Sequence, residues 1–64
     1  MAIHLKAARV NAGKTQTEAA KEIGISKGTL ASYEMYRTKP DIETAEKIAA
    51  TYGMSVDDII FYVR

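Results

Sequence analysis

The chain has 64 residues and a formal net charge of +1, and it contains no cysteine. This length allows a single domain, residues 1–64, with a small core, and the missing cysteines exclude disulfides and thiolate metal sites. No apolar stretch approaches the roughly 18 residues of a membrane span, and residues 1–10 lack the uninterrupted apolar region of a signal peptide, so we expect a cytoplasmic protein without a membrane partner.

Residues 3–12 are the first predicted helix. Leu5, Ala8 and Ala12 recur at helical spacing, so they form one apolar stripe that can face a core. Gly13 follows at the position where a left-handed residue commonly ends a helix.

Residues 16–23 are the second predicted helix. Thr15 and Glu18 have the spacing of a capping box, in which the hydroxyl accepts from the Glu18 amide and the carboxylate accepts from the Thr15 amide. The free amides at the start of this helix suit a phosphate, and Gln16 lies beside them. A solvated first-turn residue is the alternative interpretation of Gln16.

A tight turn at Gly24 leads to the third predicted helix, residues 27–35. Gly24 tolerates the positive φ that such a turn needs, and the small Ala20 lets two steeply crossed helices approach closely. Leu30 and Tyr33 are three residues apart, so both can face the interior. This spacing is typical of a helix-turn-helix, whose second helix enters the DNA major groove.

The outward face of the third predicted helix is small. Ser26 is placed to cap the helix. The residues that we expect to face outward are Lys27, Gly28, Ala31, Ser32 and Met35. Lysine can donate to guanine, serine can bond several bases, and an alanine methyl can contact a thymine methyl. Since few long polar side chains are available, we expect DNA shape or close backbone approach at Gly28 to supply part of the specificity.

The following loop carries a short basic and hydroxyl-bearing run, Arg37, Thr38 and Lys39. This composition suits phosphate contacts, and the Tyr36 hydroxyl can add one. An exposed charged loop without a partner is the alternative interpretation.

Residues 42–51 and 56–61 are the fourth and fifth predicted helices, with Asp41 and Ser55 as their caps. We expect the apolar stripe of the fourth helix to be buried. Its members are Ile42, Ala45, Ile48, Ala49 and Tyr52.

The end of the chain is more apolar than a terminus requires. Its candidate interface residues are Ile60, Phe61, Tyr62 and Val63. Only one face of this segment can reach a small core, so we expect the remainder to form a homodimer interface. The alternative is an ordinary helix end that completes the core.

Charge is divided unevenly along the chain. Residues 1–39 carry seven Lys and Arg against three Asp and Glu, and residues 40–64 carry two against five. A basic face beside an acidic back favours binding to phosphates. A chance split across a small solvated surface is the alternative interpretation.

Residues 5–60 resemble the lambda-repressor-like, Cro/C1-type (XRE) helix-turn-helix family. The resemblance rests on residues 16–34 with the turn at Gly24, and on Arg9 and residues 39–43. It implies an all-α, compact five-helix fold in which helices 2 and 3 form the helix-turn-helix.

The resemblance, together with the side-chain chemistry, implies roles for single residues. A salt bridge between Arg9 and Glu34 ties the first helix to the third, and a direct phosphate contact is the alternative for Arg9. The implied base-contacting residues are Lys27, Gly28, Ala31 and Ser32. The implied backbone-contacting residues are Gln16, Thr17, Ser26, Thr29, Tyr36, Arg37, Thr38 and Lys39.

Four positions depart from the family pattern. Relatives often have glycine at the position of Tyr36 and a long polar side chain at that of Gly28, and they usually have leucine at those of Lys14 and Ala19. We therefore expect larger neighbours, such as Tyr33 and Tyr52, to fill the space between the helices.

These patterns predict a sequence-specific regulator of transcription that binds double-stranded DNA, a repressor of phage or mobile-element type. Two recognition helices on a two-fold axis read half-sites about 34 Å apart, so we expect a homodimer on an inverted-repeat operator. A chain of this length has little room for a sensing module, so we expect no small-molecule ligand and no cofactor. Such a protein is bacterial or phage-encoded and lies on the nucleoid when bound.

Two other classes of function were weighed. A protein-interaction module on the same scaffold, antitoxin-like or coactivator-like, is the second hypothesis. We predict that the protein is not an enzyme, because the sequence offers no nucleophile, metal cluster or glycine-rich phosphate loop. The paired carboxylates Glu43 and Glu46 have no accompanying nucleophile, and the solitary His4 is interpreted as a solvated surface residue.

Overall fold

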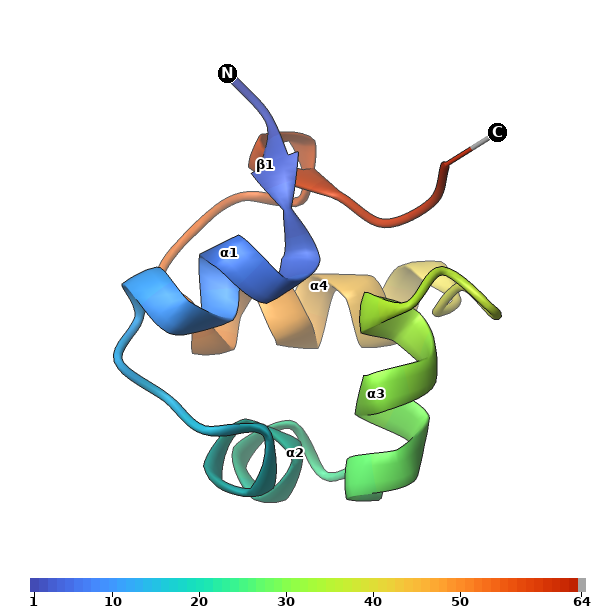
Figure 1. The fold of residues 1–64 in the computed structure, drawn as a ribbon. Helices are drawn as coiled ribbons and strands as arrows, with labels where there is room; N and C mark the ends of the chain where they lie inside the picture. Colours follow the sequence, from blue (N-terminus) through green and yellow to red (C-terminus); the bar gives the residue numbers. More distant parts are fainter. Residues whose placement is uncertain (64) are drawn as a thin grey trace.

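A computed structural model describes residues 1–63, which form four α-helices and a pair of two-residue strands (Figure 1). The elements in chain order are β1 (Ile3–His4), α1 (Leu5–Asn11), α2 (Gln16–Ile23), α3 (Lys27–Glu34), α4 (Ile42–Thr51), the 3₁₀-helix η1 (Val56–Asp58) and β2 (Ile59–Ile60). Both termini lie on the side of the molecule that carries the strands, and α2 and α3 lie on the other side. None of the helices in this part of the chain is long and apolar enough to span a membrane.

The core is built from the inward faces of all four α-helices. Leu5 from α1, Leu30 from α3 and Ile48 from α4 are its fully buried large side chains. Small residues of α2, Ala19 and Ala20, are also buried and let that helix lie close to its neighbours. Tyr33 and Tyr52 pack on this cluster, as their size at these positions predicts.

Three helices begin with the caps that the sequence predicts. The Thr15 hydroxyl accepts from the Glu18 amide at 3.1 Å and the Glu18 carboxylate accepts from the Thr15 amide at 2.9 Å, which completes the capping box of α2. That backbone hydrogen bond lowers the pKa of Glu18 below its usual value. Ser26 accepts from the Thr29 amide, and Asp41 from that of Thr44.

The prediction of a fifth helix over residues 56–61 is wrong. One 3₁₀ turn, η1, is followed by β2, which pairs in parallel with β1 in the register Ile3 to Ile59 and His4 to Ile60. The two consecutive β-branched residues of β2 favour an extended backbone, and β1 supplies hydrogen-bond partners from the other end of the chain. Ser55 donates to the Asp58 carboxylate and does not cap a backbone amide.

Three further boundaries differ from the prediction, and one of them is the end of α1 at Asn11, one residue early. The first helix begins at Leu5, because the two residues before it belong to β1, and α3 ends at Glu34, with Met35 as its C-cap. Ile42 is 80% exposed and does not belong to the core. It is the first residue of α4, at an open apolar groove that Phe61 and Tyr62 also line.

Candidate nucleic-acid interface

The turn between α2 and α3 has the geometry of a helix-turn-helix. Gly24 adopts φ +91°, and the amides of Gly24 and Ile25 both donate to the Ala20 carbonyl, at 2.8 and 3.0 Å. Ala20 itself is buried beneath the crossing. A left-handed glycine therefore ends α2 and turns the chain directly into α3, as the spacing of these residues predicts.

Helix α3 is held at its inner face and open at its outer face. Leu30 is fully buried and Tyr33 is half-buried, whereas Lys27 and Gly28 are exposed. Ala31 and Ser32, which are expected to face outward, are partly covered. A β-carbon added at Gly28 would meet nothing within 4 Å, so the fold itself does not require glycine there.

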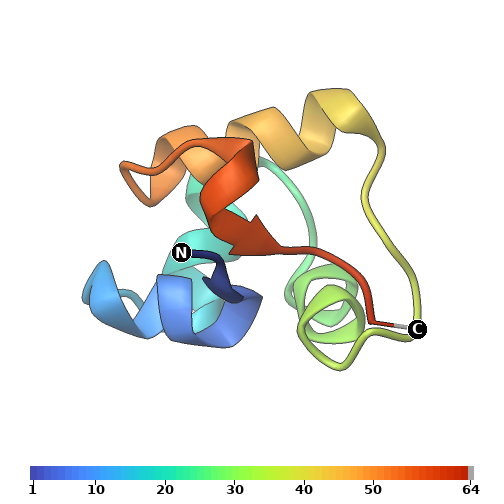
Figure 2. The same cartoon turned by 90° about the horizontal axis from the view of Figure 1, so that it is seen from above.

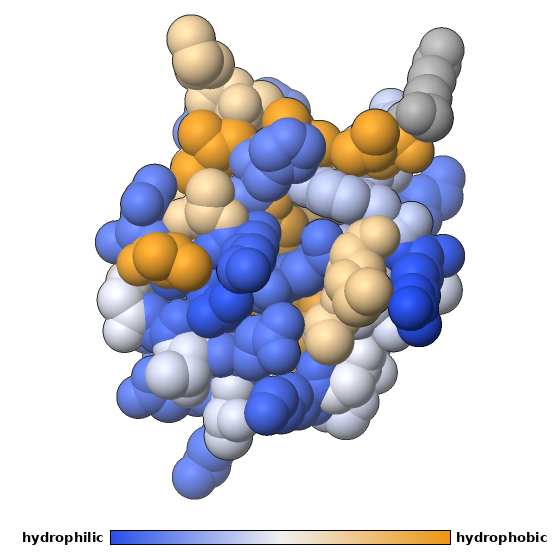
Figure 3. All heavy atoms as spheres, in the orientation of Figure 1, coloured by the Kyte–Doolittle hydropathy of each residue, from blue (hydrophilic) through white to orange (hydrophobic). Residues whose placement is uncertain are grey.

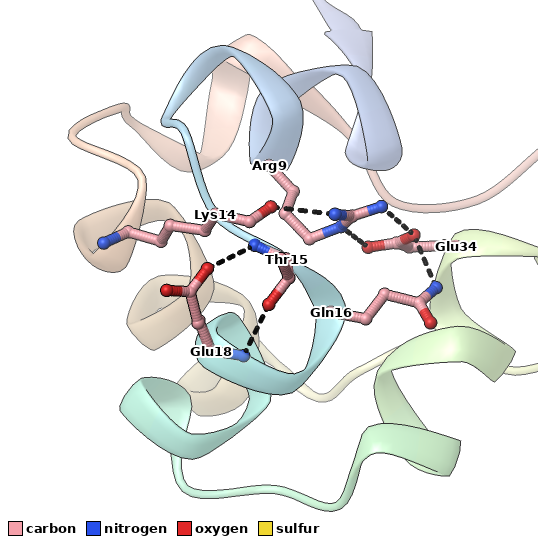
Figure 4. Close-up of polar contacts among 6 residues, drawn as sticks. All are labelled: Arg9, Lys14, Thr15, Gln16, Glu18 and Glu34. Carbon is pink, nitrogen blue, oxygen red and sulfur yellow. Dashed lines mark hydrogen bonds and ion pairs between the residues drawn. The ribbon is translucent and has the colours of Figure 1, made fainter.

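A buried ion pair fixes the last turn of α3 to α1 (Figure 4). Arg9 Nε donates to Glu34 Oε2 at 2.7 Å and Arg9 Nη2 to Glu34 Oε1 at 3.3 Å, and the two side chains are only 10% and 3% exposed. Arg9 Nη1 also donates to the Lys14 carbonyl at 2.8 Å. These contacts favour the structural role of Arg9 over a phosphate contact, since Nε, Nη1 and Nη2 each donate within the protein.

Glu34 also organises the start of α2. Gln16 Nε2 donates to Glu34 Oε1 at 3.0 Å, so one carboxylate joins residues of α1, α2 and α3 (Figure 4). Because a carboxylate only accepts, the amide nitrogen of Gln16 must face it. The second N–H of that amide stays available to a ligand, so Gln16 is held in place without losing its capacity to contact a phosphate.

A polar hollow lies over the start of α2. Its lining includes Lys6, Lys14, Gln16, Thr17 and Lys27, from α1, α2, α3 and the segment between α1 and α2. Lys14 pairs with Glu22 at 3.0 Å, so Lys6 and Lys27 are the less compensated cations of the hollow. Sequence analysis missed Lys6. Its spacing of three residues from Arg9 on the same helix is the signal that places it on this side.

The loop after α3 carries three exposed residues of the predicted backbone-contacting set, Arg37, Thr38 and Lys39. Tyr36 differs from its prediction, because its hydroxyl is engaged within the protein. The hydroxyl oxygen lies 2.6 Å from His4 Nδ1 and 3.3 Å from the Ile60 carbonyl oxygen. His4 is exposed, as predicted, and its side chain contacts Tyr36.

The hydroxyls near the start of α3 serve the helix itself. Ser26 Oγ and Thr29 Oγ1 lie 2.8 Å apart, and Ser26 caps the helix. Both residues sit next to exposed Lys27, where the first amides of α3 also lie. Thr17 is exposed on the first turn of α2, so two helix N-termini face the same hollow side of the domain.

The residues predicted to form a dimer interface divide into two pairs. Ile60 and Phe61 are half-buried against the domain, whereas Tyr62 and Val63 are 61% and 56% exposed. In the orientation of Figure 3, the half of the surface over α2 and α3 is mostly hydrophilic, and apolar residues gather at the opposite end near both termini. On the face drawn, apolar residues are therefore concentrated toward the strands, although exposed Met35 lies at the end of α3.

The domain is small and helical, and α3, the second helix of the motif, is anchored at its inner face and exposed at its outer face. This arrangement defines the helix-turn-helix class. The sequence model described as Helix-turn-helix matches residues 5–59, which is most of the chain. The chain belongs to the helix-turn-helix family of the Cro/C1 type. No solved structure gives a significant match.

Relatives from bacteria and archaea share this domain. The HTH-type transcriptional regulator ImmR of Bacillus subtilis is 39% identical over 56 residues, which cover 88% of this chain and 44% of ImmR. The cryptic phage CTXphi transcriptional repressor RstR of Vibrio cholerae is 36% identical, over 81% of this chain and 47% of RstR. An uncharacterised HTH-type transcriptional regulator of Methanocaldococcus jannaschii is 35% identical, over 75% of this chain and 73% of its own length. The chain thus spans less than half the length of the first two relatives.

Proposed function

We propose that this protein regulates transcription by sequence-specific binding of double-stranded DNA, with α3 in the major groove. The observation that carries the proposal is the mounting of α3. Leu30 and Glu34 fix its inner face, whereas Lys27 and Gly28 at its start are exposed. A helix held this way can enter a groove without losing its packing. The relative RstR is named a phage repressor, which supports a repressor of phage or mobile-element type.

Base contacts in this proposal come from the outer face of α3. The base-contacting residues are Lys27, Gly28, Ala31 and Ser32. Lys27 is the only one with a long donor, which suits guanine O6 and N7. Gly28 has open space around it, so the helix backbone can approach the floor of the groove closely at this residue. Sequence preference then depends strongly on DNA shape.

Backbone contacts come from both sides of α3. Residues at the starts of α2 and α3 and in the loop after α3 supply them: Gln16, Thr17, Ser26, Thr29, Arg37, Thr38 and Lys39. Lys6 joins this set because it lines the same hollow as Gln16 and Lys27. Tyr36 is not included among the proposed backbone contacts, because its hydroxyl forms hydrogen bonds within the protein.

We further propose a homodimer that binds an inverted repeat. The exposed Tyr62 and Val63, with Ile60 and Phe61 beneath them, offer the apolar surface for pairing. One α3 reads only a few base pairs, so a second copy is needed for specificity. A regulator of this kind acts in the cytoplasm, on the nucleoid when bound.

A binding selection from a pool of random DNA duplexes tests the proposal. Enrichment of an inverted repeat over successive rounds would support both specific binding and pairing of two copies. Retention without enrichment would contradict sequence specificity and leave a phosphate-driven binder. No retention would contradict DNA binding altogether.

Charge reversal separates the interface from the rest of the surface. Lys27→Glu should abolish binding to the selected duplex, because it puts a negative charge at the groove entrance. Lys47→Glu on α4 is the matched control, since Lys47 is also an exposed helical lysine and changes the net charge equally. Equal losses in both variants would mean that net charge alone drives binding and would contradict the assignment to α3.

A protein-interaction module is the second candidate function. An apolar groove at the start of α4 is lined in part by Ile42, Phe61 and Tyr62, and Ile42 is 80% exposed. This surface lies apart from Lys27 in the sequence, and it shares Lys39 with the proposed phosphate contacts and Phe61 and Tyr62 with the proposed dimer surface. If the chain retains no DNA in the selection, this apolar groove becomes the candidate binding surface.

A further inference from the structure

Helix α3 ends in a backbone conformation that is unusual for its residue. The Tyr36 amide donates to the Tyr33 carbonyl at 3.1 Å and the Arg37 amide to the Ser32 carbonyl at 3.0 Å. This pair of bonds is a Schellman motif, in which the residue after the C-cap is left-handed. Tyr36 has φ +60°, and it is the only residue other than glycine with a positive φ among residues 1–63. Glycine usually takes this position because a side chain is unfavourable there.

The Tyr36 side chain reaches both terminal strands at a single register position. Its hydroxyl contacts the His4 side chain of β1 and the Ile60 carbonyl of β2, and His4 and Ile60 are register partners. The Tyr36 and His4 rings also pack edge to face, with centroids 5.7 Å apart. We call Tyr36, His4 and Ile60 the terminal clasp. It joins the end of α3 to both ends of the chain.

The hydrogen bonds of the clasp must run in one direction. A tyrosine hydroxyl has a single hydrogen. When that hydrogen is donated to the Ile60 carbonyl, the contact with His4 requires Nδ1 to be the donor. The chain of bonds then runs from His4 through Tyr36 to Ile60, so the loss of the hydroxyl removes both contacts together.

A second contact joins the same loop to the same terminal segment. Lys39 Nζ lies 5.6 Å from the centroid of the Tyr62 ring, within the range of a cation–π interaction. Figure 2 shows the chain after β2 running toward the loop that follows α3. The loop is therefore fastened at both of its ends, and Arg37 and Thr38 lie exposed between the two fastenings.

We propose that Tyr36 is a positioning residue for DNA binding. Through the terminal clasp it sets the direction in which the chain leaves α3, and so it presents Arg37, Thr38 and Lys39 to DNA phosphates. The inference rests on the proposed function, because it assigns the loop to the DNA backbone. It explains why a strained tyrosine stands at a position that suits glycine.

The test compares the salt dependence of binding to one mixed-sequence DNA duplex. Tyr36→Phe removes only the hydroxyl, and Tyr52→Phe, which removes the same atom from a ring outside the proposed DNA and dimer surfaces, is the matched control. Each phosphate contact contributes about 0.9 to the slope of log affinity against log salt. We expect Tyr36→Phe to lower the slope by roughly 1 to 2 and to weaken binding several-fold at low salt. Tyr52→Phe should match the wild type.

A double-mutant cycle distinguishes positioning from a general loss of stability. If Tyr36 acts through the loop, Tyr36→Phe should add little to the effect of Arg37→Ala with Lys39→Ala, since the contacts that it positions are already gone. Fully additive losses would overturn the proposal and leave Tyr36 as a structural residue. An unchanged slope in Tyr36→Phe would also overturn it.

The outcomes also separate this inference from the proposed function. A wild-type protein that binds no duplex contradicts the proposed function, and the clasp proposal falls with it. If the wild-type protein binds the duplex and Tyr36→Phe has the same salt-dependence slope, the clasp proposal alone is contradicted. If Tyr36→Phe does not fold, His4→Phe decides, because it keeps an aromatic ring at the exposed side of the clasp and removes Nδ1. It should then show the lowered slope, and a slope equal to that of the wild type would overturn the proposal.

Discussion

Helices α1 and α3 end with the same backbone hydrogen bonds but with different residues in the left-handed position. At the end of α1, Gly13 donates to the Val10 carbonyl and Lys14 to the Arg9 carbonyl, at 2.9 and 3.3 Å. The end of α3 repeats this pattern with Tyr36 in place of glycine.

The difference between the two ends shows where the chain only turns and where it also makes contacts. At Gly13 an added β-carbon would meet nothing within 4 Å, so a side chain there would begin in open space. A left-handed conformation costs a residue with a side chain about 1–2 kcal/mol. Two hydrogen bonds and an aromatic contact offset this cost at Tyr36. The glycine end of α1 only changes the direction of the chain, whereas the tyrosine end of α3 also contacts the two terminal strands.

The largest expected change in the free energy of unfolding comes from replacing Arg9, which lies near the end of α1 and pairs with Glu34 at the end of α3. Arg9→Met should destabilise the domain by about 3–5 kcal/mol, because it leaves the Glu34 carboxylate buried without its cation. A domain of this length has a total stability of roughly 3–10 kcal/mol, so the substitution should remove at least about a third of it. Urea unfolding followed by circular dichroism measures the change.

A surface ion pair near the end of α1 is the control for Arg9. Lys14→Met removes the pair with Glu22, whose side chain is 49% exposed, and it should cost no more than about 1 kcal/mol. Comparable losses in the two variants would contradict the dominant role of the buried pair.

The next effect concerns the end of α4, where Tyr52 is the C-cap before Gly53. Burial, with a further contribution from the Glu34 charge, raises the pKa of Tyr52 to about 12. In the unfolded chain a tyrosine titrates near pH 10, so the fold favours the neutral phenol. The stability that this residue contributes is complete below pH 10 and is lost as the pH rises from 10 toward 12.

Tyr52→Phe isolates this pH dependence. The Tyr52 hydroxyl is buried without a hydrogen-bond partner in residues 1–63, so we expect little change in stability at pH 7. Above pH 10 the variant should gain on the wild type by about 1.4 kcal/mol per pH unit. Unfolding free energies at pH 7 and pH 10–11 measure the difference, and a constant offset between the two proteins would contradict it.

At the end of α3, two substitutions of Tyr36 separate strain from contact. Tyr36→Ala removes the contacts of the side chain and keeps the unfavourable conformation, whereas Tyr36→Gly removes both. The glycine variant should therefore be more stable than the alanine variant by about 1 kcal/mol. Thermal melts of the two variants provide the comparison. Equal stabilities would mean that the backbone relaxes out of the left-handed region.

The same preference for glycine over alanine should appear at the ends of α1 and α4, where glycine is already present. Gly13→Ala and Gly53→Ala should each destabilise the domain by about 1 kcal/mol, because φ is +73° and +70° while space for the β-carbon is open. The cost is then conformational, without a steric clash. A neutral result at both positions would contradict the requirement for glycine at these ends.

The smallest effect is expected at a glycine that is not left-handed. Gly28 lies within α3, and Gly28→Ala should stabilise the domain by up to about 1 kcal/mol. If the backbone of α3 approaches DNA closely there, the same variant should bind its selected duplex more weakly. A higher melting temperature with unchanged DNA binding would contradict the close approach.

Local features were predictable from the sequence because their partners lie within a few residues. The capping box of Thr15 and Glu18 and the glycine turn at Gly24 involve neighbours along the chain, and both are present. The bounds of α2 and α4 are as predicted for the same reason. The ion pair of Arg9 and Glu34, which joins distant residues, was expected only from the resemblance to a family.

Non-local pairing accounts for what sequence reasoning missed. The cap at Ser55 is a local signal and predicts helix over residues 59–60, because nothing nearby indicates that β1 lies beside them. The exposure of Ile42 has the same origin, since its helical spacing fits the core but the packing of the other elements leaves it 80% exposed. The candidate DNA-contacting residues of α3 followed from the resemblance to the family and from side-chain chemistry, but Lys6 required the position of α1.

By itself, the sequence determined the helix-turn-helix, its caps and the small outer face of α3, because hydrogen bonds and side-chain periodicity within a few residues specify them. Only the tertiary structure decided what Tyr36 does. Its hydroxyl meets His4 and Ile60, which come together through the pairing of the two chain ends. Such a contact depends on how all the elements pack, so no local pattern encodes it.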